Sequence, residues 1–436
     1  MIALDNVFRQ YDIRGEYPYE INEEFAEKLG LATANYLSNS GTVIVGCDFR
    51  PSGSRLKAAL ISGLMRGGVT VVDISPCTTD MLTFATVTSK PDLSIMVTAS
   101  HLPLKYNGFK YISNQGVYLS QKERSKIKGI LAKGEFKEGK GKVERLNVVD
   151  KYLSAVKRLM NWSGRTLSGI KLVTYPMGGT AILTLPKLLE DLGAEVYVIR
   201  EVAEDPEPKD DNTTILREEV LAKKGLLGLI NDGDGDRLAA RNHDGSYITG
   251  DHLLCIFAKL YSKLGKVVIT IDSSSAVFEY VRGELIVSKV GEANYVIDAI
   301  KHGAIFGGEP SGHFVDLRFT PSGSGTLFGA ILAEIAKRGD LDKMLAEIPK
   351  FYTYRVKVVC KDRLTTMSRV VAELEREGVE ILSRIDGVKY RVGGATVLIR
   401  PSNTEQVVRA TVESKDAEEA KSMLGRVEDM LRRFSA

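Results

Sequence analysis

Short apolar runs rich in β-branched residues recur along the chain, and each ends abruptly at glycine, serine or aspartate. The six runs that we interpret as strands are 42–48, 93–100, 170–179, 226–236, 266–275 and 304–313. Continuous apolar runs of this length are typical of strands buried on both faces. Helical patterns lie between them, over 21–37, 54–66, 149–160, 181–192, 214–224 and 250–263. Strands that alternate with helices in this way predict parallel α/β layers.

The six predicted strands fall into three pairs. The first strand of each pair ends in a polar loop, and these loops read CDFRPSG, YPMGG and DSSSA. The second strand ends in a loop richer in functional groups, and these loops read TASH, DGDGDR and GGEPSGH. We interpret the pairs as three copies of one α/β unit. Ligands in open α/β sheets bind beyond the carboxyl ends of strands, so we expect the chemistry in these loops.

The C-terminal part of the chain has a different pattern. A charged stretch at 121–147 predicts a solvated helix and linker that close the first unit, and 349–353 marks a later boundary. Beyond it we predict strands and helices over 354–360, 363–377, 387–392, 395–400, 407–413 and 416–434. This order predicts a small α+β domain with an antiparallel sheet. We therefore expect four domains, at 1–147, 148–248, 249–349 and 350–436.

The composition is that of an ordinary globular protein, with 436 residues of which 44% are hydrophobic and 26% charged. The net charge of +3 is too small to indicate a nucleic-acid partner. No CxxC pair occurs, and isolated cysteines indicate buried thiols in a reducing compartment; they are Cys47, Cys77, Cys255 and Cys360. The N-terminus contains charged residues and no apolar run reaches about 18 residues, so we expect a soluble cytoplasmic protein.

The loop NDGDGDR at 231–237 alternates three aspartates with two glycines. In an extended segment Asp232, Asp234 and Asp236 share one side, and the glycines permit tight bending. Converging carboxylates repel one another unless a cation lies among them, and hard oxygen ligands suit Mg²⁺ or Ca²⁺. The alternative is an Asp-Gly hairpin turn; an EF-hand is excluded because its required glycine and glutamate are missing. Arg237 beside the cluster suggests an added phosphate contact.

A second loop, TASHLPLKYNGFK at 98–110, contains Ser100, His101 and Lys110. We predict that Ser100 ends a strand, where its side chain can project into a cleft. Serine next to histidine resembles an activated nucleophile. Neighbouring residues in a strand point to opposite faces, however, so adjacency does not establish His101 as the base. The alternative is a serine that only terminates a strand.

Two further loops carry polar residues that suit a sugar phosphate. In GGEPSGH at 307–313, a carboxylate and a hydroxyl on one face suit the hydroxyls of a sugar. In RPSNTE at 400–405, an arginine and three small donors can form a phosphate cradle. Ordinary turns are the alternative in both loops. FRQYDIRG at 8–15 and GCDFRPSG at 46–53 are weak signals on their own.

Taken together, the loops resemble those of the α-D-phosphohexomutase family, which includes phosphomannomutase/phosphoglucomutase and phosphoglucosamine mutase. The matching motifs are FRQYDIRG, TASH, DGDGDR, SKVGEANY, GGEPSGH and RPSNTE, in the family's order and over essentially the whole chain. The resemblance implies four domains around one cleft. Three are related α/β units with mixed sheets, and the fourth is a C-terminal α+β domain that resembles the TATA-box-binding-protein fold.

The resemblance also implies a role for each matching residue. Ser100 would be the phosphorylated serine, and its phosphate would bind Mg²⁺ together with Asp232, Asp234 and Asp236. The sugar hydroxyls would be held by Glu309 and Ser311. The non-reacting phosphate would be held by Arg400, Ser402, Asn403 and Thr404. The cleft around the reacting groups would be lined by Tyr11, Arg14, Lys110, Arg237, Lys289 and His313, with Lys110 and His101 as candidate general bases.

The implied reaction interconverts hexose 1-phosphate and hexose 6-phosphate by two phosphoryl transfers, with hexose 1,6-bisphosphate as intermediate and activator. The Ser-Asn-Thr sequence of the phosphate loop favours mannose and glucose phosphates, and phosphoglucosamine mutase is the alternative within the family. A Mg²⁺-dependent sugar-phosphate phosphatase and a non-catalytic sugar-phosphate binding protein are the alternatives from other classes. We expect small sugar phosphates as partners, no nucleic acid or membrane, and a monomer or homodimer.

The chain departs from the family pattern at three positions. Leu102 stands where many relatives have asparagine, which removes one possible hydrogen bond beside Ser100. Gln406 replaces a frequent proline after the phosphate loop, where we expect little effect because the donors precede it. Ser322 stands where relatives often have aspartate before glycine.

Overall fold

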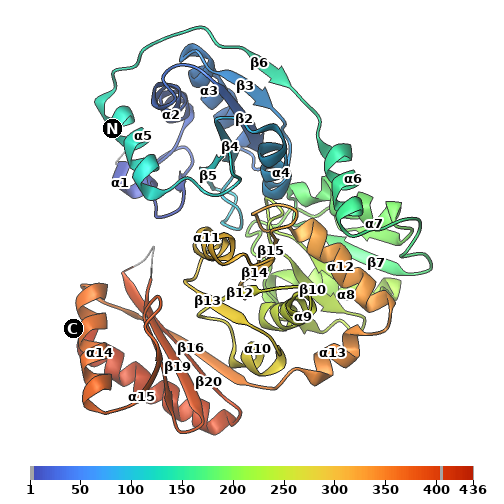
Figure 1. Ribbon diagram of the computed structural model, residues 1–436, viewed down its shortest axis with the longest axis vertical. Helices are drawn as coiled ribbons and strands as arrows, with labels where there is room; N and C mark the ends of the chain where they lie inside the picture. The colour runs from blue at the N-terminus through green and yellow to red at the C-terminus, as the bar shows by residue number, and fades with distance from the viewer. Residues whose placement is uncertain (1–3, 403–405, 436) are drawn as a thin grey trace. The chain divides into compact units, whose positions relative to one another are not determined.

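The computed structural model describes residues 4–402 and 406–435 (Figure 1). The chain packs as two compact units. The first unit comprises Met1–Gly250 and Ser311–Lys343, and the second comprises Asp251–Pro310 and Met344–Ala436.

The first sheet has six strands in the order β1-β5-β4-β2-β3-β6. Its strands are β1 Ile13–Glu16, β2 Thr42–Cys47, β3 Thr70–Asp73, β4 Leu93–Val97, β5 Tyr106–Ser113 and β6 Val143–Arg145. β4 is parallel to β2 and antiparallel to β5, so the sheet is mixed. Every residue of β4 is buried, as its continuous apolar run predicts. The loop between β4 and β5 contains the TASH motif.

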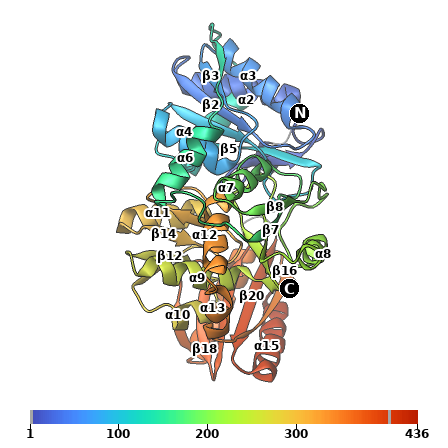
Figure 2. The same ribbon diagram turned by 90° about the vertical axis from the view of Figure 1, so that its right-hand side faces the viewer.

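Helices cover this sheet, and their bounds are α1 Leu4–Val7, α2 Glu23–Tyr36, α3 Gly53–Arg66, α4 Thr79–Ser89 and α5 Gln121–Lys133. Figure 2 shows α2 and α3 side by side. Ser120 and Glu123 form a capping box that starts α5, the helix predicted at the head of the charged stretch. The predicted linker after α5 contains β6, which pairs in parallel with β3. All three residues of β6 are exposed, so no apolar pattern marks this strand in the sequence.

The second sheet is also mixed, with the order β11-β10-β9-β7-β8. Its strands are β7 Lys171–Tyr175, β8 Glu195–Val198, β9 Leu227–Ile230, β10 Ala239–Asn242 and β11 Tyr247–Ile248. β7 is parallel to β8 and β9, whereas β10 is antiparallel to β9. The accompanying helices are α6 Val149–Leu159, η1 Thr180–Leu183, α7 Leu185–Asp191, η2 Asp211–Thr213 and α8 Thr214–Lys223. The turn between β9 and β10 contains the aspartate motif.

A buried aspartate joins three helices of the first unit, which also contains β15 Phe314–Asp316 and α12 Gly325–Lys337. The carboxylate of Asp80, on α4, accepts hydrogen bonds from the hydroxyls of Tyr152 on α6 and Ser324, each at 2.5 Å. Ser324 is in turn the N-cap of α12. Burial raises the pKa of Asp80 to about 6.

The second unit begins with an α/β segment whose strands are parallel, β12 pairing with both β13 and β14. The elements are α9 Gly250–Ser262, β12 Val267–Thr270, α10 Ser275–Tyr280, β13 Leu285–Ser288, α11 Glu292–His302 and β14 Phe306–Gly308. After α13 Leu341–Glu347, the chain enters the C-terminal sheet.

The C-terminal sheet is antiparallel, with the order β16-β20-β19-β18-β17. Its elements are β16 Tyr352–Val359, α14 Arg363–Arg376, β17 Glu380–Ser383, β18 Val388–Val392, β19 Ala395–Pro401, β20 Val407–Ser414 and α15 Ala417–Ser435. Apolar residues of β18, β19 and β20 pack against residues of α14 and α15 in one core, and Figure 2 shows α15 along the sheet. β17 was not predicted, because only alternate residues of this short strand are partly buried.

These elements confirm the predicted fold class of α/β units with mixed sheets and a C-terminal α+β domain. The four domain limits stay a prediction. The four cysteines are buried and free, as predicted. Among the helices of the described residues, none combines the length and apolar character needed to cross a membrane.

The raised pKa of Asp80 predicts how stability depends on pH. A carboxyl with a pKa of about 6 in the folded state and about 3.9 in the unfolded chain binds its proton more tightly when folded. From about pH 7 to about pH 5, the wild type should therefore gain roughly 1 kcal/mol of stability relative to Asp80→Asn. Urea unfolding of both proteins at both pH values measures this difference.

The control is Asp150→Asn on α6, where the hydrogen bond from Lys187 lowers the pKa of an exposed carboxylate. The stability difference between the wild type and Asp150→Asn should be the same at both pH values. A difference for Asp80→Asn that does not vary with pH would contradict the raised pKa.

Candidate active site

Ser100 lies in a turn, not at the end of a strand as predicted. β4 ends at Val97, and Ser100 has a φ of +53°, in the left-handed region that non-glycine residues rarely adopt. Its side chain is nevertheless directed at other functional groups. The hydroxyl donates to Asp232 Oδ2 at 2.8 Å. His101 Nδ1 lies 3.4 Å from the hydroxyl oxygen of Ser100. The turn, rather than strand geometry, brings His101 to the side of Ser100.

The aspartate motif also forms a turn rather than the extended segment we predicted. It connects the antiparallel strands β9 and β10, so the hairpin alternative describes its backbone correctly. The three carboxylates converge even so. Asp232, Asp234 and Asp236 are fully buried, and one oxygen of each lies within 4.8 Å of the others.

The two glycines of the motif let this turn approach other backbone closely. A Cβ at Gly233 would lie 2.8 Å from the carbonyl oxygen of Ser100. Gly235 has a φ of +72°, and a Cβ there would lie 2.8 Å from the side chain of Thr78. Larger residues would therefore push the aspartates away from the serine loop and from α4.

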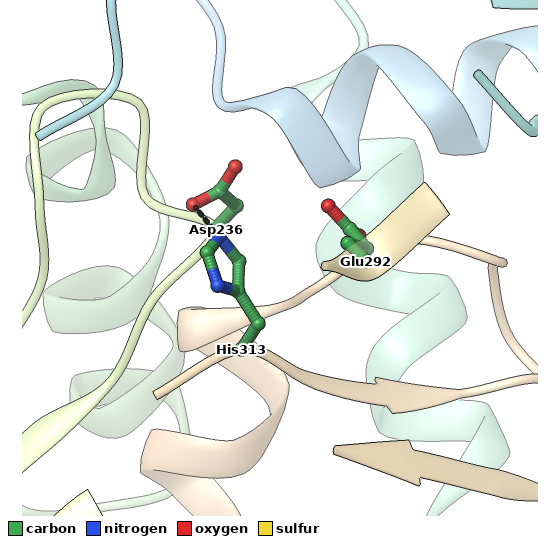
Figure 3. A group of neighbouring side chains, drawn as sticks. All are labelled: Asp236, Glu292 and His313. Atoms are coloured by element: carbon green, nitrogen blue, oxygen red, sulfur yellow. Dashed lines mark ion pairs between the residues drawn. The ribbon is translucent and has the colours of Figure 1, made fainter. Parts of the chain in front are cut away.

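Three groups of the first unit, one of them a lysine, lie close to the carboxylates. Lys110, on β5, places its Nζ 2.7 Å from Asp234 Oδ2 and 2.6 Å from Asp236 Oδ2. His313 Nε2 lies 3.0 Å from Asp236 Oδ1, the ion pair drawn in Figure 3. The backbone N–H of Arg237 donates to Asp232 Oδ1 at 3.2 Å.

Burial and charge move the pKa values of these groups in different directions. Burial, and then the charges of Asp236 and Asp234, raise the pKa of Asp232 to about 8. Burial would also raise the pKa of Asp236, but Lys110 and then His313 hold it well below its usual range. Burial lowers the pKa of Lys110, yet the two carboxylates raise it well above its ordinary value. The raised pKa of Asp232 indicates that a third negative charge in this cluster is unfavourable unless a further cation lies beside it.

The residues present fit a divalent cation. Within the described part of the chain, Asp234 Oδ1 is buried and has no hydrogen-bond partner. A buried carboxylate oxygen left without a donor is costly, and a hard cation such as Mg²⁺ would satisfy it. Three carboxylates are the oxygen donors that such a cation prefers. The aspartates are therefore the candidate metal ligands.

Thr79 supports one of these ligands and was not recognised from the sequence. Its hydroxyl donates to Asp234 Oδ2 at 2.6 Å, and its backbone N–H donates to the carbonyl of Asp234 at 2.9 Å. Thr79 is the first residue of α4, after the N-cap Thr78. Nothing in the sequence connects Thr79 with a motif that lies 155 residues later.

Two further predicted residues of the first unit, Arg14 and Ser311, lie close to the serine loop or the aspartates. Arg14 pairs with Asp12 at 2.5 Å and donates to the carbonyl of Ala99 at 3.1 Å. Ser311 Oγ lies 2.9 Å from Nδ1 of His313, which contacts Asp236 through its other ring nitrogen. Tyr11 is half-buried and hydrogen-bonded to Gln10, and its role stays a prediction.

Burial, and then the positive charges of Arg237 and Arg14, lower the pKa of His101 well below its usual value. The imidazole is therefore neutral near pH 7. A neutral ring beside the serine hydroxyl can accept a proton, which the charged form could not.

In the second unit, a row of cations crosses the C-terminal sheet. Lys357 of β16 lies opposite Arg409 of β20, which lies opposite Arg400 of β19. The row places three positively charged side chains next to one another, a concentration of charge that attracts anions. These three residues also line a cavity of about 450 Å³ together with Arg355 and Asp272.

Only Arg400 of this row was predicted, although alternating cations at Arg355 and Lys357 were a detectable signal. Arg400 forms an ion pair with Asp386 at 3.1 Å. Ser402, next in the predicted phosphate loop, is buried, and its carbonyl accepts from Arg363 at 2.7 Å. Asn403 and Thr404 lie outside the described residues.

Two predicted residues of the second unit flank the start of α11. Glu309 is buried and accepts a hydrogen bond from the backbone N–H of Gly291 at 3.0 Å. Lys289 is exposed in the loop between β13 and α11. Their predicted contacts with a sugar stay predictions.

Comparison with known protein families gives four matches in succession along the chain. The models are those of phosphoglucomutase/phosphomannomutase alpha/beta/alpha domain I over residues 5–138, domain II over 150–245, domain III over 249–352, and the C-terminal domain over 355–430. Together they cover nearly all of the chain.

Individual relatives match over nearly their full length. The chain is 31% identical to the probable phosphoglucosamine mutase of Pyrococcus abyssi over 98% of each chain. It is 32% identical to that of Methanosarcina barkeri, over 94% of this chain and 95% of the other.

Solved structures show the same fold. A phosphoglucomutase/phosphomannomutase family protein from Burkholderia thailandensis matches with a TM-score of 0.87 at 26% identity, covering 100% of this chain and 97% of the other. A putative phosphomannomutase from Thermus thermophilus matches with a TM-score of 0.82 at 24% identity, covering 99% and 100%.

The contacts of Thr79 predict its effect on metal binding. Thr79→Val removes the hydroxyl that orients Asp234, so we expect Mg²⁺ affinity to fall by about 10-fold, as is usual when a ligand loses its outer hydrogen bond. Calorimetric titration of the protein with Mg²⁺ measures this affinity directly. Thr83→Val, on the same helix, is the matched control, because its buried hydroxyl bonds only to the carbonyl of Thr79 among the contacts described. Equal affinities in the two variants would contradict the role of Thr79.

Proposed function

We propose that this chain, which belongs to the phosphoglucomutase/phosphomannomutase family of isomerases, moves a phosphoryl group between O1 and O6 of a hexose phosphate through a phosphoserine at Ser100. The observation that carries the proposal is the 2.8 Å contact between the Ser100 hydroxyl and Asp232, one of three buried, converging carboxylates. A nucleophilic oxygen beside a cation site suits phosphoryl transfer, in which positioning and charge neutralisation do most of the catalysis.

The proposed reaction has two balanced halves. In the first, the P–O bond to Ser100 breaks and a new bond forms to the free hydroxyl of a hexose 1- or 6-phosphate, giving the 1,6-bisphosphate. In the second half, the other phosphoryl group of the bisphosphate passes to Ser100. The proton lost by the sugar hydroxyl in the first half returns to the product oxygen in the second. Hexose 1,6-bisphosphate therefore also serves as an activator, because it phosphorylates an enzyme that has lost its phosphate.

A magnesium ion held by Asp232, Asp234, Asp236 and the phosphoserine would neutralise the charge of the transferred group. The chain's own residues position the partners. Lys110 and Thr79 orient two of the carboxylates, and Arg237 and Arg14 add positive charge near Ser100.

His101 is the better of the two candidate bases. The Nζ of Lys110 donates to two carboxylates, so removing its proton would leave a negatively charged pair without its counter-ion. His101 is neutral and lies 3.4 Å from the Ser100 oxygen. The loose transition state of phosphoryl transfer needs little covalent help, so a weak base suffices.

The cationic row of the second unit supplies a site for the phosphate that does not react. Lys357, Arg409 and Arg400 present three positive charges, and Arg side chains bind phosphate oxygens in a bidentate manner. Ser402 follows Arg400 and Pro401 in the predicted phosphate loop, and the phosphate contacts of Asn403 and Thr404 stay predictions. Because this site would recognise only the phosphate group, it would bind a phosphate on O1 or on O6 of the sugar.

Two substrate classes remain as candidates, and they differ at C2 of the sugar. The relatives named as probable phosphoglucosamine mutases support glucosamine phosphate. The Ser-Asn-Thr sequence of the phosphate loop supports mannose or glucose phosphate. A phosphatase or a non-catalytic binding protein would not need both a nucleophile beside a metal site and a separate phosphate clamp.

The substrate is tested by turnover. With Mg²⁺ and a catalytic amount of the matching 1,6-bisphosphate, we expect the purified protein to convert the 1-phosphate of mannose, glucose or glucosamine into the 6-phosphate. The ratio of kcat/KM among the three sugars, measured by coupled assay or phosphorus NMR, identifies the preferred one. Release of free phosphate without isomerisation would indicate the phosphatase instead. Tight binding without any reaction would indicate a binding protein.

The nucleophile is tested by removal of its hydroxyl. Ser100→Ala should lower kcat by at least about 1000-fold and abolish the phosphorylated form seen by intact-protein mass spectrometry, because no other group can take its place. Ser94→Ala is a matched control, since Ser94 is a buried serine on β4 that contacts only Thr86 among the described hydrogen bonds. Retention of most activity in Ser100→Ala would remove Ser100 from the mechanism.

A further inference from the structure

We propose that Arg50 is a positioning residue that holds the nucleophile Ser100 in its reactive conformation. This inference rests on the proposed role of Ser100 as the phosphoryl carrier. Arg50 follows β2 in the motif GCDFRPSG and is only 4% exposed. In the sequence it was a weak signal, because nothing there connects it with a loop 50 residues away.

The guanidinium group binds the serine loop through four backbone carbonyl oxygens. One terminal nitrogen donates to Ser100 and Leu102, at 2.5 and 2.6 Å. The other donates to Pro103 and Tyr106, at 2.8 and 2.9 Å. A planar arginine fork fixes direction as well as distance, so these bonds determine how the whole loop turns.

Asp48 connects the guanidinium group of Arg50, through Thr98, with the backbone N–H of Ser100. Its carboxylate lies 3.2 Å from Arg50 Nε and accepts from the Thr98 hydroxyl at 2.6 Å. That hydroxyl in turn accepts from the backbone N–H of Ser100 at 2.8 Å. Both backbone polar groups of Ser100 are therefore bound by one network that starts at Arg50 and Asp48.

The left-handed conformation of Ser100 requires such a network. A φ of +53° is unfavourable for serine and persists only where its surroundings determine it. In this conformation the hydroxyl reaches Asp232, which belongs to the other sheet of the unit. A relaxed loop would turn the hydroxyl away from the carboxylates and the cation they would hold.

The network also explains why the serine loop can have leucine at position 102. The position takes part in the clamp through its backbone carbonyl, which any residue supplies. The side chain that many relatives have there is therefore not needed to hold this loop.

The test uses variants of two buried arginines. Arg50→Lys keeps the charge but loses the fork, whereas Arg50→Ala leaves a space that guanidinium can fill. The matched control is Arg241→Lys, because Arg241 is also 4% exposed and donates to carbonyl oxygens of residues 210, 213 and 245, outside the serine loop. Intact-protein mass spectrometry after rapid quench follows single-turnover phosphorylation of dephosphorylated protein by glucose 1,6-bisphosphate. Equilibrium binding of the same bisphosphate to each variant is measured separately.

We expect Arg50→Lys to phosphorylate Ser100 about 100-fold more slowly, the usual effect of misplacing a reacting group by about 1 Å, with binding changed by less than about 3-fold. Arg241→Lys should lower the melting temperature but leave the phosphorylation rate unchanged. Millimolar guanidinium should restore part of the rate in Arg50→Ala. If both Arg50 variants fail to fold, Asp48→Asn provides the same test, with a smaller loss of rate expected.

Wild-type rates in Arg50→Lys, or equal losses in the Arg50 and Arg241 variants, would overturn the positioning role alone. If the wild type gains no phosphate from glucose 1,6-bisphosphate or from glucosamine 1,6-bisphosphate, the proposed function fails and this inference fails with it.

Discussion

Three buried carboxylates that converge within 4.8 Å set the main constraint on this molecule. At an effective dielectric constant of about 20, two unit charges at such a separation repel by roughly 3 kcal/mol. The first unit can bury the cluster only because other segments bring compensating groups to it. Lys110 comes from the first sheet and His313 from the segment after β14. The remaining deficit of positive charge makes the cluster a candidate site for a cation.

The same compensation holds the first two sheets together. Lys110 on β5 and Thr79 on α4 belong to the first sheet and its helices, but both bind aspartates between β9 and β10. Gly233 and Gly235 permit the close approach that these contacts require. Behind them, Asp80 links α4 with α6 and α12. The aspartate motif and the loop that contains Ser100 are therefore supported by the same buried helices and strands.

The C-terminal sheet of the second unit has a row of cations, in contrast to the carboxylates of the first unit. Its cations stand in opposite positions across three strands, an arrangement that concentrates positive charge. In the proposed reaction, the carboxylates suit the cation that phosphoryl transfer requires, and the cations suit the phosphate that does not react.

The sequence by itself determined the central strands of the α/β units and the loops rich in polar groups that follow them, but not every buried strand, since β5 and β10 were not predicted. The continuous apolar run of β4 predicted a central strand, and the DGDGDR motif predicted a carboxylate cluster, because burial and charge repulsion act on the residues of one segment. Polar, short strands such as β6 and β17 escaped prediction, since they bury too little to leave a pattern.

Only the tertiary structure decided how the site is assembled. Lys110 pairs with two aspartates of another sheet, and Arg50 is hydrogen-bonded to the loop that contains Ser100. The left-handed conformation of Ser100 occurs within this loop. Periodicity records which face of an element is buried, but it does not record which distant element lies against it. The choice of partner depends on the packing of whole sheets, and the nucleophile's conformation depends on that packing.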